Sequence, residues 1–230
     1  MAYIGEVVGG GRTTKGKAFL VYGVSVENNQ NRLIKAVSDS DTVRISPLGG
    51  STTNNYLQLP PLTYNAIQTM NIGGEAFAGN GLHTDDVYHI HDDPSEYASE
   101  LCKILKGWGA KPDKYNTPRI AAINDRKYRI VLGIVTSKSV SAATFKDTDR
   151  SKAILISTYT GNTVTPEPPV FRHFTDITKT IDIEGNTAQE LANSLFEVDP
   201  NFVCTAAAVY RGVKYSSVLE WEVAVKNLFR

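Results

Sequence analysis

Alternating apolar and polar residues predict a chain built largely from β-strands. Between residues 218 and 226, apolar side chains alternate with charged ones, which is typical of a strand with one buried and one solvated face. Similar apolar or β-branched runs predict further strands at residues 3–8, 17–25, 42–47, 119–123, 127–135, 152–159 and 202–210. Asn124-Asp125-Arg126 predicts a hairpin turn, and Gly9-Gly10-Gly11 predicts a turn after the first strand.

Two segments carry helix signals. Asp93-Pro94 predicts a helix start, followed by an apolar stripe that ends near Gly107 and Gly109. Thr187 with Glu190 three residues later predicts a capping box at the start of a second helix. Strands that outnumber helices without strict alternation favour an α+β fold with sheet packed on sheet, and we expect one domain over residues 1–230. The proline-rich stretch 161–169 is interpreted as a surface loop, because it is too short to separate domains.

The charge balance narrows the function classes. The chain has 24 Lys and Arg against 24 Asp and Glu, so its formal net charge is zero. This argues against nucleic-acid binding through bulk charge but leaves room for a local basic pocket. No apolar run reaches the length of a membrane span and no secretory signal is evident, so we expect a cytoplasmic protein that contacts neither membrane nor nucleic acid. Cys102 and Cys204 are expected to be reduced thiols.

The sequence gives little support for a metal site, a catalytic cysteine, a P-loop or a nucleophile elbow. His83, His89 and His91 lie close together beside aspartates, a set of side chains that can hold a metal. A helix start explains this segment better, since Asp93 already has a capping role. The two cysteines lack a catalytic context, and neither a P-loop nor a nucleophile elbow is present. We therefore expect no metal and no cofactor.

Polar clusters beside apolar strands are better candidates for a site. They lie at residues 25–32, Tyr64-Asn65, 80–85 and 115–119, and are interpreted as loops on a rigid scaffold. Taken singly, each is more typical of turn chemistry than of a site.

Taken together and in order, these and neighbouring segments form a recognisable set. They are Tyr3-Ile4-Gly5, Gly11-Arg12, Asn31-Arg32, Pro60 with Tyr64-Asn65, Asn80-Gly81 with His83-Thr84-Asp85, Asn116-Thr117-Pro118-Arg119-Ile120-Ala121, Ile156-Ser157-Thr158-Tyr159 and Thr205-Ala206-Ala207-Ala208. The chain thereby resembles the archaeal-type IMP cyclohydrolase family over nearly its whole length. It departs from the family pattern in three places: residues 26–30 lack an arginine, Leu82 stands where the family has serine, and Asp113 is the one acid in residues 111–114.

The resemblance implies a fold and a reaction. The fold is a four-layer α-β-β-α sandwich similar to that of N-terminal nucleophile hydrolases, although Met1-Ala2 offers no such nucleophile. The reaction closes a formamido-imidazole-carboxamide ribonucleotide (FAICAR) to IMP with loss of water, the final step of de novo purine biosynthesis. It requires no metal, redox cofactor or covalent intermediate. The implied partners are the nucleotide substrate and product, and homo-oligomerisation is left open.

The resemblance also implies site residues. Tyr64 is the expected proton donor or orienting group, and Arg119 contacts phosphate or the developing oxyanion. Asp85 and Asp113 are the alternative acid or base. Substrate-binding roles fall to polar and basic residues: Arg12, Asn31, Arg32, Asn65, Asn80, Thr84 and Thr117. Two alternatives remain open at this stage, a non-catalytic purine-nucleotide-binding protein on the same scaffold and a metal-dependent hydrolase that uses the histidines.

Overall fold

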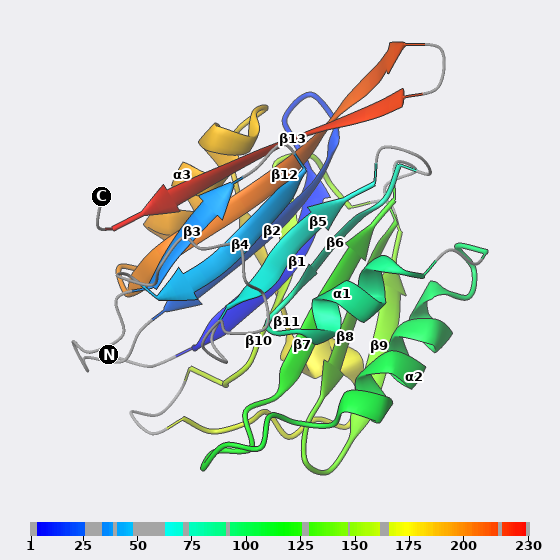
Figure 1. Ribbon diagram of the computed structural model, residues 1–230, viewed down its shortest axis with the longest axis vertical. Helices are drawn as coiled ribbons and strands as arrows, with labels where there is room; N and C mark the ends of the chain where they lie inside the picture. Colours follow the sequence, from blue (N-terminus) through cyan, green and yellow to red (C-terminus); the bar gives the residue numbers. More distant parts are fainter. Residues whose placement is uncertain are drawn as a thin grey trace.

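The computed structural model describes residues 4–25, 34–38, 41–47, 63–70, 74–90, 93–125, 129–146, 148–161, 166–215 and 218–228. These residues form two antiparallel sheets (Figure 1). The six-stranded sheet has the order β11 (Thr178–Asp182), β10 (Lys152–Ser157), β1 (Glu6–Arg12), β2 (Ala18–Ser25), β12 (Phe202–Tyr215) and β13 (Val218–Asn227). The seven-stranded sheet has the order β3 (Ile34–Ser38), β4 (Thr42–Pro47), β5 (Tyr64–Thr69), β6 (Ala76–Gly79), β7 (Arg119–Asn124), β8 (Ile130–Val135) and β9 (Val140–Phe145).

The two sheets pack face to face, and helices cover their outer faces (Figure 1). The layer between the sheets contains Leu20 from β2 and Ile67 from β5. Helix α3 (Ala188–Val198) packs on the six-stranded sheet, while α1 (His83–Tyr88) and α2 (Tyr97–Trp108) cover the seven-stranded sheet. A 3₁₀ turn, η2 (Phe174–Ile177), precedes β11. The α+β class is therefore confirmed.

Several predicted elements are confirmed. The strand over residues 42–47 is β4, and the predicted hairpin is the antiparallel pair β7–β8. The capping box at α3 is present, with the Thr187 hydroxyl accepting the Glu190 N–H and the Glu190 carboxylate accepting backbone N–H groups in return.

The predicted turn at Gly9-Gly10-Gly11 is wrong, because β1 runs straight through these glycines. They allow neighbouring strands to approach closely. A Cβ on Gly9 would lie 2.2 Å from the Ile154 carbonyl oxygen, and one on Gly11 would lie 1.8 Å from that of Lys152.

Two other boundaries differ from the predictions. The helix expected after Asp93 begins at Tyr97, because the Asp93 carboxylate instead accepts the Ser95 N–H in a turn. Residues 80–85 are not wholly a loop, since α1 begins at His83, and Tyr64-Asn65 opens β5.

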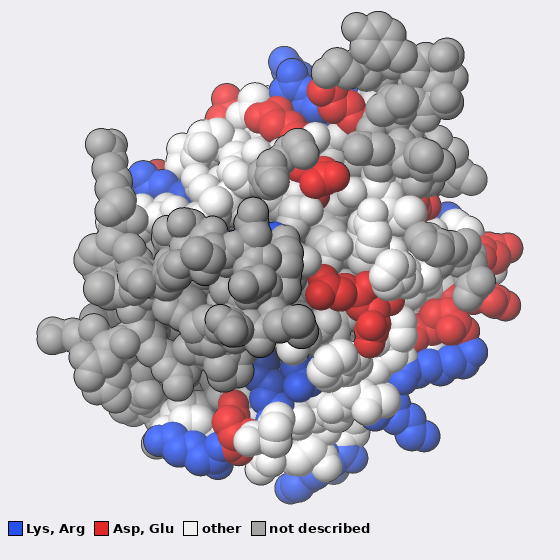
Figure 2. All heavy atoms as spheres, viewed as in Figure 1, with Lys and Arg blue, Asp and Glu red and all other residues white. Residues whose placement is uncertain are grey.

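Acidic and basic side chains are interspersed on the face shown in Figure 2.

Among the helices in the described ranges, none combines the length and apolar character needed to cross a bilayer.

Candidate functional site

The start of strand β1 directs a carboxylate between the two sheets. Side chains alternate along a strand. Val7 packs in the cluster under α3, whereas Val8 packs in the layer between the sheets. Glu6 therefore points to the same side as Val8, toward the seven-stranded sheet. Its own backbone N–H donates to the Thr158 hydroxyl at 3.0 Å.

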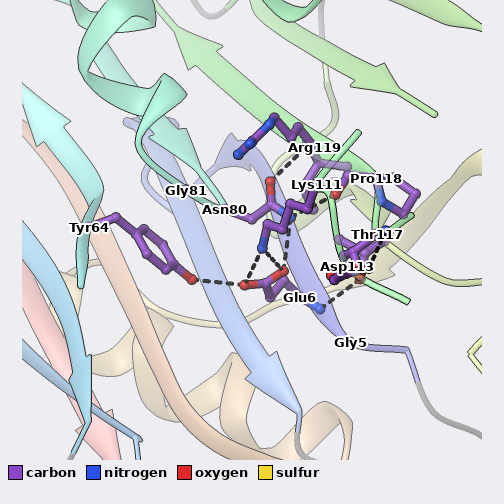
Figure 3. A network of polar contacts seen from close by, with 12 residues as sticks. Gly5, Glu6, Tyr64, Asn80, Gly81, Lys111, Asp113, Thr117, Pro118 and Arg119 are labelled. Atoms are coloured by element: carbon purple, nitrogen blue, oxygen red, sulfur yellow. Dashed lines mark hydrogen bonds and ion pairs between the residues drawn. The ribbon is translucent and has the colours of Figure 1, made fainter. Parts of the chain in front are cut away.

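Glu6 is the centre of a polar network (Figure 3). Its Oε1 accepts from the Tyr64 hydroxyl at 2.9 Å and from Lys111 Nζ at 3.2 Å. Its Oε2 accepts from Asn80 Nδ2 at 2.9 Å and from Lys111 Nζ at 2.9 Å. The Glu6 side chain is 16% exposed and that of Lys111 23% exposed, so solvent only partly screens the ion pair.

Two tyrosines extend the network into the core. The Tyr22 and Tyr64 hydroxyl oxygens are 2.5 Å apart. Because Tyr64 donates to Glu6, the Tyr22 hydroxyl is the donor in the contact with Tyr64. Burial, and then the nearby Glu6 carboxylate, raise the pKa of Tyr64 well above its ordinary value. Tyr64 thus keeps its proton at neutral pH.

Asn80 ties this network to the edge of β7. The residue is fully buried just after β6. Its Oδ1 accepts the Ile120 N–H at 2.8 Å, while its Nδ2 donates to the Pro118 carbonyl at 2.9 Å and to Glu6. The Asn80 amide therefore positions the Glu6 carboxylate beside the start of β7.

The loop between α2 and β7 supplies Lys111. The Asp113 carboxylate accepts the N–H groups of Tyr115 and Thr117, each at 3.0 Å, and the Lys111 N–H donates to the Thr117 carbonyl. Partial desolvation raises the pKa of Asp113, but the hydrogen bonds from Thr117 and Tyr115 outweigh it and hold the pKa below its usual value. Asp113 thus shapes the loop that carries Lys111, and the structure does not bring it into contact with Glu6.

Thr117 links the same loop to the other sheet. Its hydroxyl lies 2.5 Å from that of Tyr159, which follows β10. Burial raises the pKa of Tyr159 to about 12. Both side chains are buried, so this contact fastens the loop above the start of β1.

Arg119 opens β7 beside the network (Figure 3). Its Nε donates to the Gly109 carbonyl at 3.1 Å, and its guanidinium lies 4.9 Å from the centre of the Trp108 ring. Partial burial lowers the pKa of Arg119, while Glu6 and Asp113 raise it. The guanidinium remains a cation, held by a carbonyl and an aromatic face.

A second group of predicted residues lies on the opposite face of the seven-stranded sheet. Asp85 on α1 accepts from Asn65 Nδ2 at 2.9 Å and from Gln68 Nε2 at 2.5 Å. Asn65 follows Tyr64 directly, so the two side chains point to opposite faces of β5. The Thr84 hydroxyl donates to the Gly81 carbonyl at 2.7 Å. The structure therefore separates Asn65, Thr84 and Asp85 from the Glu6 network.

Three other predicted substrate-binding residues are not brought to the network by the structure. Arg12 ends β1, six residue steps along the strand from Glu6, a distance of about 20 Å. Asn31 and Arg32 lie outside the described residues.

His83 serves the packing of α1. The side chain is fully buried, and its Nε2 donates to the Ile120 carbonyl at 3.0 Å. Burial lowers its pKa to about 3, so the imidazole is neutral. Among the residues that the structure describes, no three His, Cys, Asp or Glu side chains are grouped to hold a metal. His91 lies outside that part of the chain.

Sequence reasoning missed three members of the network: Glu6, Lys111 and Tyr22. Glu6 directly follows Tyr3-Ile4-Gly5, and Lys111 lies in the noted stretch 111–114, so each had a neighbouring signal but no local feature of its own. Tyr22 lies within an apolar strand. Cys204, also close by, is buried with its pKa raised to about 12, so it is a thiol rather than a thiolate.

Comparison with known proteins places the chain in a family. The sequence profile of the IMP cyclohydrolase-like protein family matches residues 3–214. The chain belongs to this family. The match includes Glu6, Tyr64, Asn80, Lys111 and Arg119, so the whole network lies within the family region.

Individual relatives extend over most of both chains. The chain is 29% identical over 220 residues to an IMP cyclohydrolase of Methanocaldococcus jannaschii, covering 94% of this chain and 98% of the relative. It is 29% identical over 199 residues to one of Methanococcus maripaludis strain C5, covering 86% and 89%. For one of Methanocella arvoryzae the identity is 26% over 209 residues, covering 91% and 92%. The resemblance drawn from the sequence motifs is thus confirmed.

Proposed function

We propose that this protein is an IMP cyclohydrolase that closes FAICAR to IMP with loss of water. The observation that carries the proposal is the similarity to IMP cyclohydrolases along nearly the full length of both chains. The layered arrangement of helices and sheets supports the further proposal that the fold is like that of N-terminal nucleophile hydrolases. Shared architecture does not carry the chemistry of those enzymes.

The reaction first requires a fixed geometry. An amide nitrogen is a poor nucleophile, so the carboxamide must be held against the formyl carbon in a near-attack arrangement. Asn80 and Glu6 lie at strand ends and are fastened by several hydrogen bonds each. Side chains held in this way keep their positions when substrate enters.

The reaction next requires donors for the formyl oxygen, which gains negative charge as the ring closes. A donor aimed at such charge is a large source of rate enhancement. Tyr64 carries a proton at neutral pH. Lys111 bonds to the Glu6 carboxylate that accepts from Tyr64, and Arg119 lies close enough to Glu6 for that carboxylate to raise its pKa. We assign Tyr64 as the proton donor, and the cations as contacts for the developing oxyanion or the substrate phosphate.

A turnover assay tests this function. Purified protein is incubated with FAICAR, and IMP is quantified by chromatography against the uncatalysed rate, with and without a chelator. We expect IMP formation well above background and no effect of chelator. Tight binding of IMP without turnover would favour a nucleotide-binding protein instead, and loss of activity with chelator would favour a metal-dependent enzyme.

A further inference from the structure

We propose that Glu6 is a catalytic residue of the ring closure: it accepts the proton of the attacking carboxamide and exchanges it with Tyr64. This inference rests on the proposed function and adds a base to it. The acids assigned from the sequence do not supply this base. The Asp113 carboxylate accepts backbone N–H groups within its own loop, and Asp85 lies on the other face of the seven-stranded sheet.

The surroundings of Glu6 suit a proton acceptor. All four of its contacts come from donors: the Tyr64 hydroxyl, the Asn80 amide and two from the Lys111 ammonium. An ionised carboxylate is an acceptor only, so all of these contacts fit a carboxylate that carries no proton of its own. Burying such a charge is costly unless donors compensate it.

The contacts differ in how readily substrate can replace them. Tyr64 and Asn80 project from a strand and a strand end, whereas Lys111 lies on the loop between α2 and β7. Lys111 Nζ is bonded to both carboxylate oxygens. When substrate binds, an N–H of its carboxamide can replace one of the two Lys111 hydrogen bonds, so Glu6 keeps its full set of donors. The Lys111 ammonium then stays near the developing oxyanion.

In the addition step, Glu6 and Tyr64 together take up and return every proton that moves. The carboxamide nitrogen bonds to the formyl carbon as its N–H proton passes to Glu6. The carbonyl π electrons move to the formyl oxygen, which takes the proton of Tyr64. Tyr64 recovers a proton from Glu6 across their 2.9 Å hydrogen bond. The result is a ring carbinol with both residues restored.

The loss of water uses the same pair. The C–O bond breaks as Tyr64 protonates the leaving hydroxyl, and the C=N bond forms as the former formamide nitrogen gives its proton to Glu6. The proton again returns from Glu6 to Tyr64. One water leaves, and no oxidant, reductant or metal enters the balance.

Two variants of Glu6 test the role. Glu6→Gln keeps the shape but cannot accept the proton, so kcat should fall by about 10²–10⁴-fold with KM changed less than about threefold. Glu6→Ala should be equally impaired, and added formate should restore turnover in proportion to its concentration. Formate should not rescue Tyr64→Phe. Glu222→Ala, which removes a surface carboxylate paired with Arg211, should keep wild-type turnover without a formate response.

The outcomes separate this inference from the function on which it rests. Turnover of folded Glu6→Gln within about threefold of wild type would overturn the inference alone. A folded Glu6→Ala that ignores formate would do the same. Where Glu6→Ala does not fold, Glu6→Asp replaces it, and kcat above that of Glu6→Gln is the expected result. Absence of turnover by the wild-type protein would overturn both proposals.

Discussion

Tyr64 illustrates how burial sets the chemical state of a single side chain. Its hydroxyl lies between Tyr22 and Glu6 in the layer between the sheets. Water is excluded there, so the phenolate form is disfavoured and the pKa rises well above that of a tyrosine in solution. The residue therefore keeps its hydroxyl proton at neutral pH and donates it in a hydrogen bond to Glu6.

Replacing Tyr64 with phenylalanine tests that donor. Tyr64→Phe keeps the ring and removes the hydroxyl, so we expect kcat to fall by about 10²-fold or more while KM changes little. Steady-state kinetics with FAICAR measure both constants. Tyr97→Phe is the matched control, because its hydroxyl donates to Glu75 on the outer face of the seven-stranded sheet. Equal kcat in the wild type and Tyr64→Phe would return Tyr64 to a packing role.

Arg119 allows a second test at the same scale. Its guanidinium is held over Trp108 and by the Gly109 carbonyl, so the positive charge has a defined position. We expect Arg119→Ala to lower kcat/KM by about 10²–10³-fold, the usual effect of removing a donor to developing charge. Arg211→Ala removes an exposed arginine that pairs with Glu222 and should leave turnover unchanged. A folded Arg119→Ala with near wild-type kinetics would contradict the assignment.

At the scale of elements, β1 combines packing and function. It carries Glu6 at its start and three consecutive glycines that admit the backbones of β10 and β2. Side chains at these positions would push the neighbouring strands away. The packing of β1 within its sheet, and with it the placement of Glu6, therefore depends on residues that have no side chain of their own.

Gly11→Ala tests the close approach. The new methyl group would meet the Lys152 carbonyl oxygen at 1.8 Å and the Phe19 ring at 2.9 Å, so the strands must separate. We expect the free energy of unfolding to fall by about 3 kcal/mol. Gly107→Ala is the control, since no atom lies within 4 Å of the new methyl group and it lies inside α2. There alanine should raise stability by about 0.5–1 kcal/mol. Denaturant titration of both variants gives the comparison, and equal midpoints would contradict the argument.

At the scale of the whole molecule, His83 couples helix α1 to the seven-stranded sheet and so to global stability. The buried imidazole has a pKa of about 3 in the folded protein. An unfolded chain exposes it, and its pKa returns to about 6.5. Between these values the unfolded state binds the additional proton, so acid favours unfolding.

The pH dependence of unfolding measures this coupling. Stability should be unaffected by His83 above about pH 6.5 and should decrease by about 1.4 kcal/mol per pH unit below it. From pH 6.5 to 5.0 the loss is about 2 kcal/mol. His83→Gln, whose side-chain amide can still donate to the Ile120 carbonyl, should lack this part of the dependence. Parallel stability curves for the two proteins between pH 7.5 and 5.0 would contradict the prediction.

Local patterns along the chain were sufficient for much of the architecture. Alternation defines β13, a turn flanked by apolar runs defines the β7–β8 hairpin, and Thr187 with Glu190 defines the start of α3. Each signal depends on neighbours a few residues apart, and each reappears in the structure. Family membership was also accessible, because it is carried by short motifs in a fixed order.

The grouping of the site residues was decided by tertiary packing. Glu6 and Lys111 are 105 positions apart, and Glu6 and Tyr64 are 58 apart. Nothing in either local sequence indicates the other, since the contact exists only once two sheets stack and a loop folds over their edge. The same packing places Tyr64 and Asn65, neighbours in the chain, on opposite faces of a strand. Local sequence determines which side chains a strand presents, and the packing of one sheet on the other determines which of them meet.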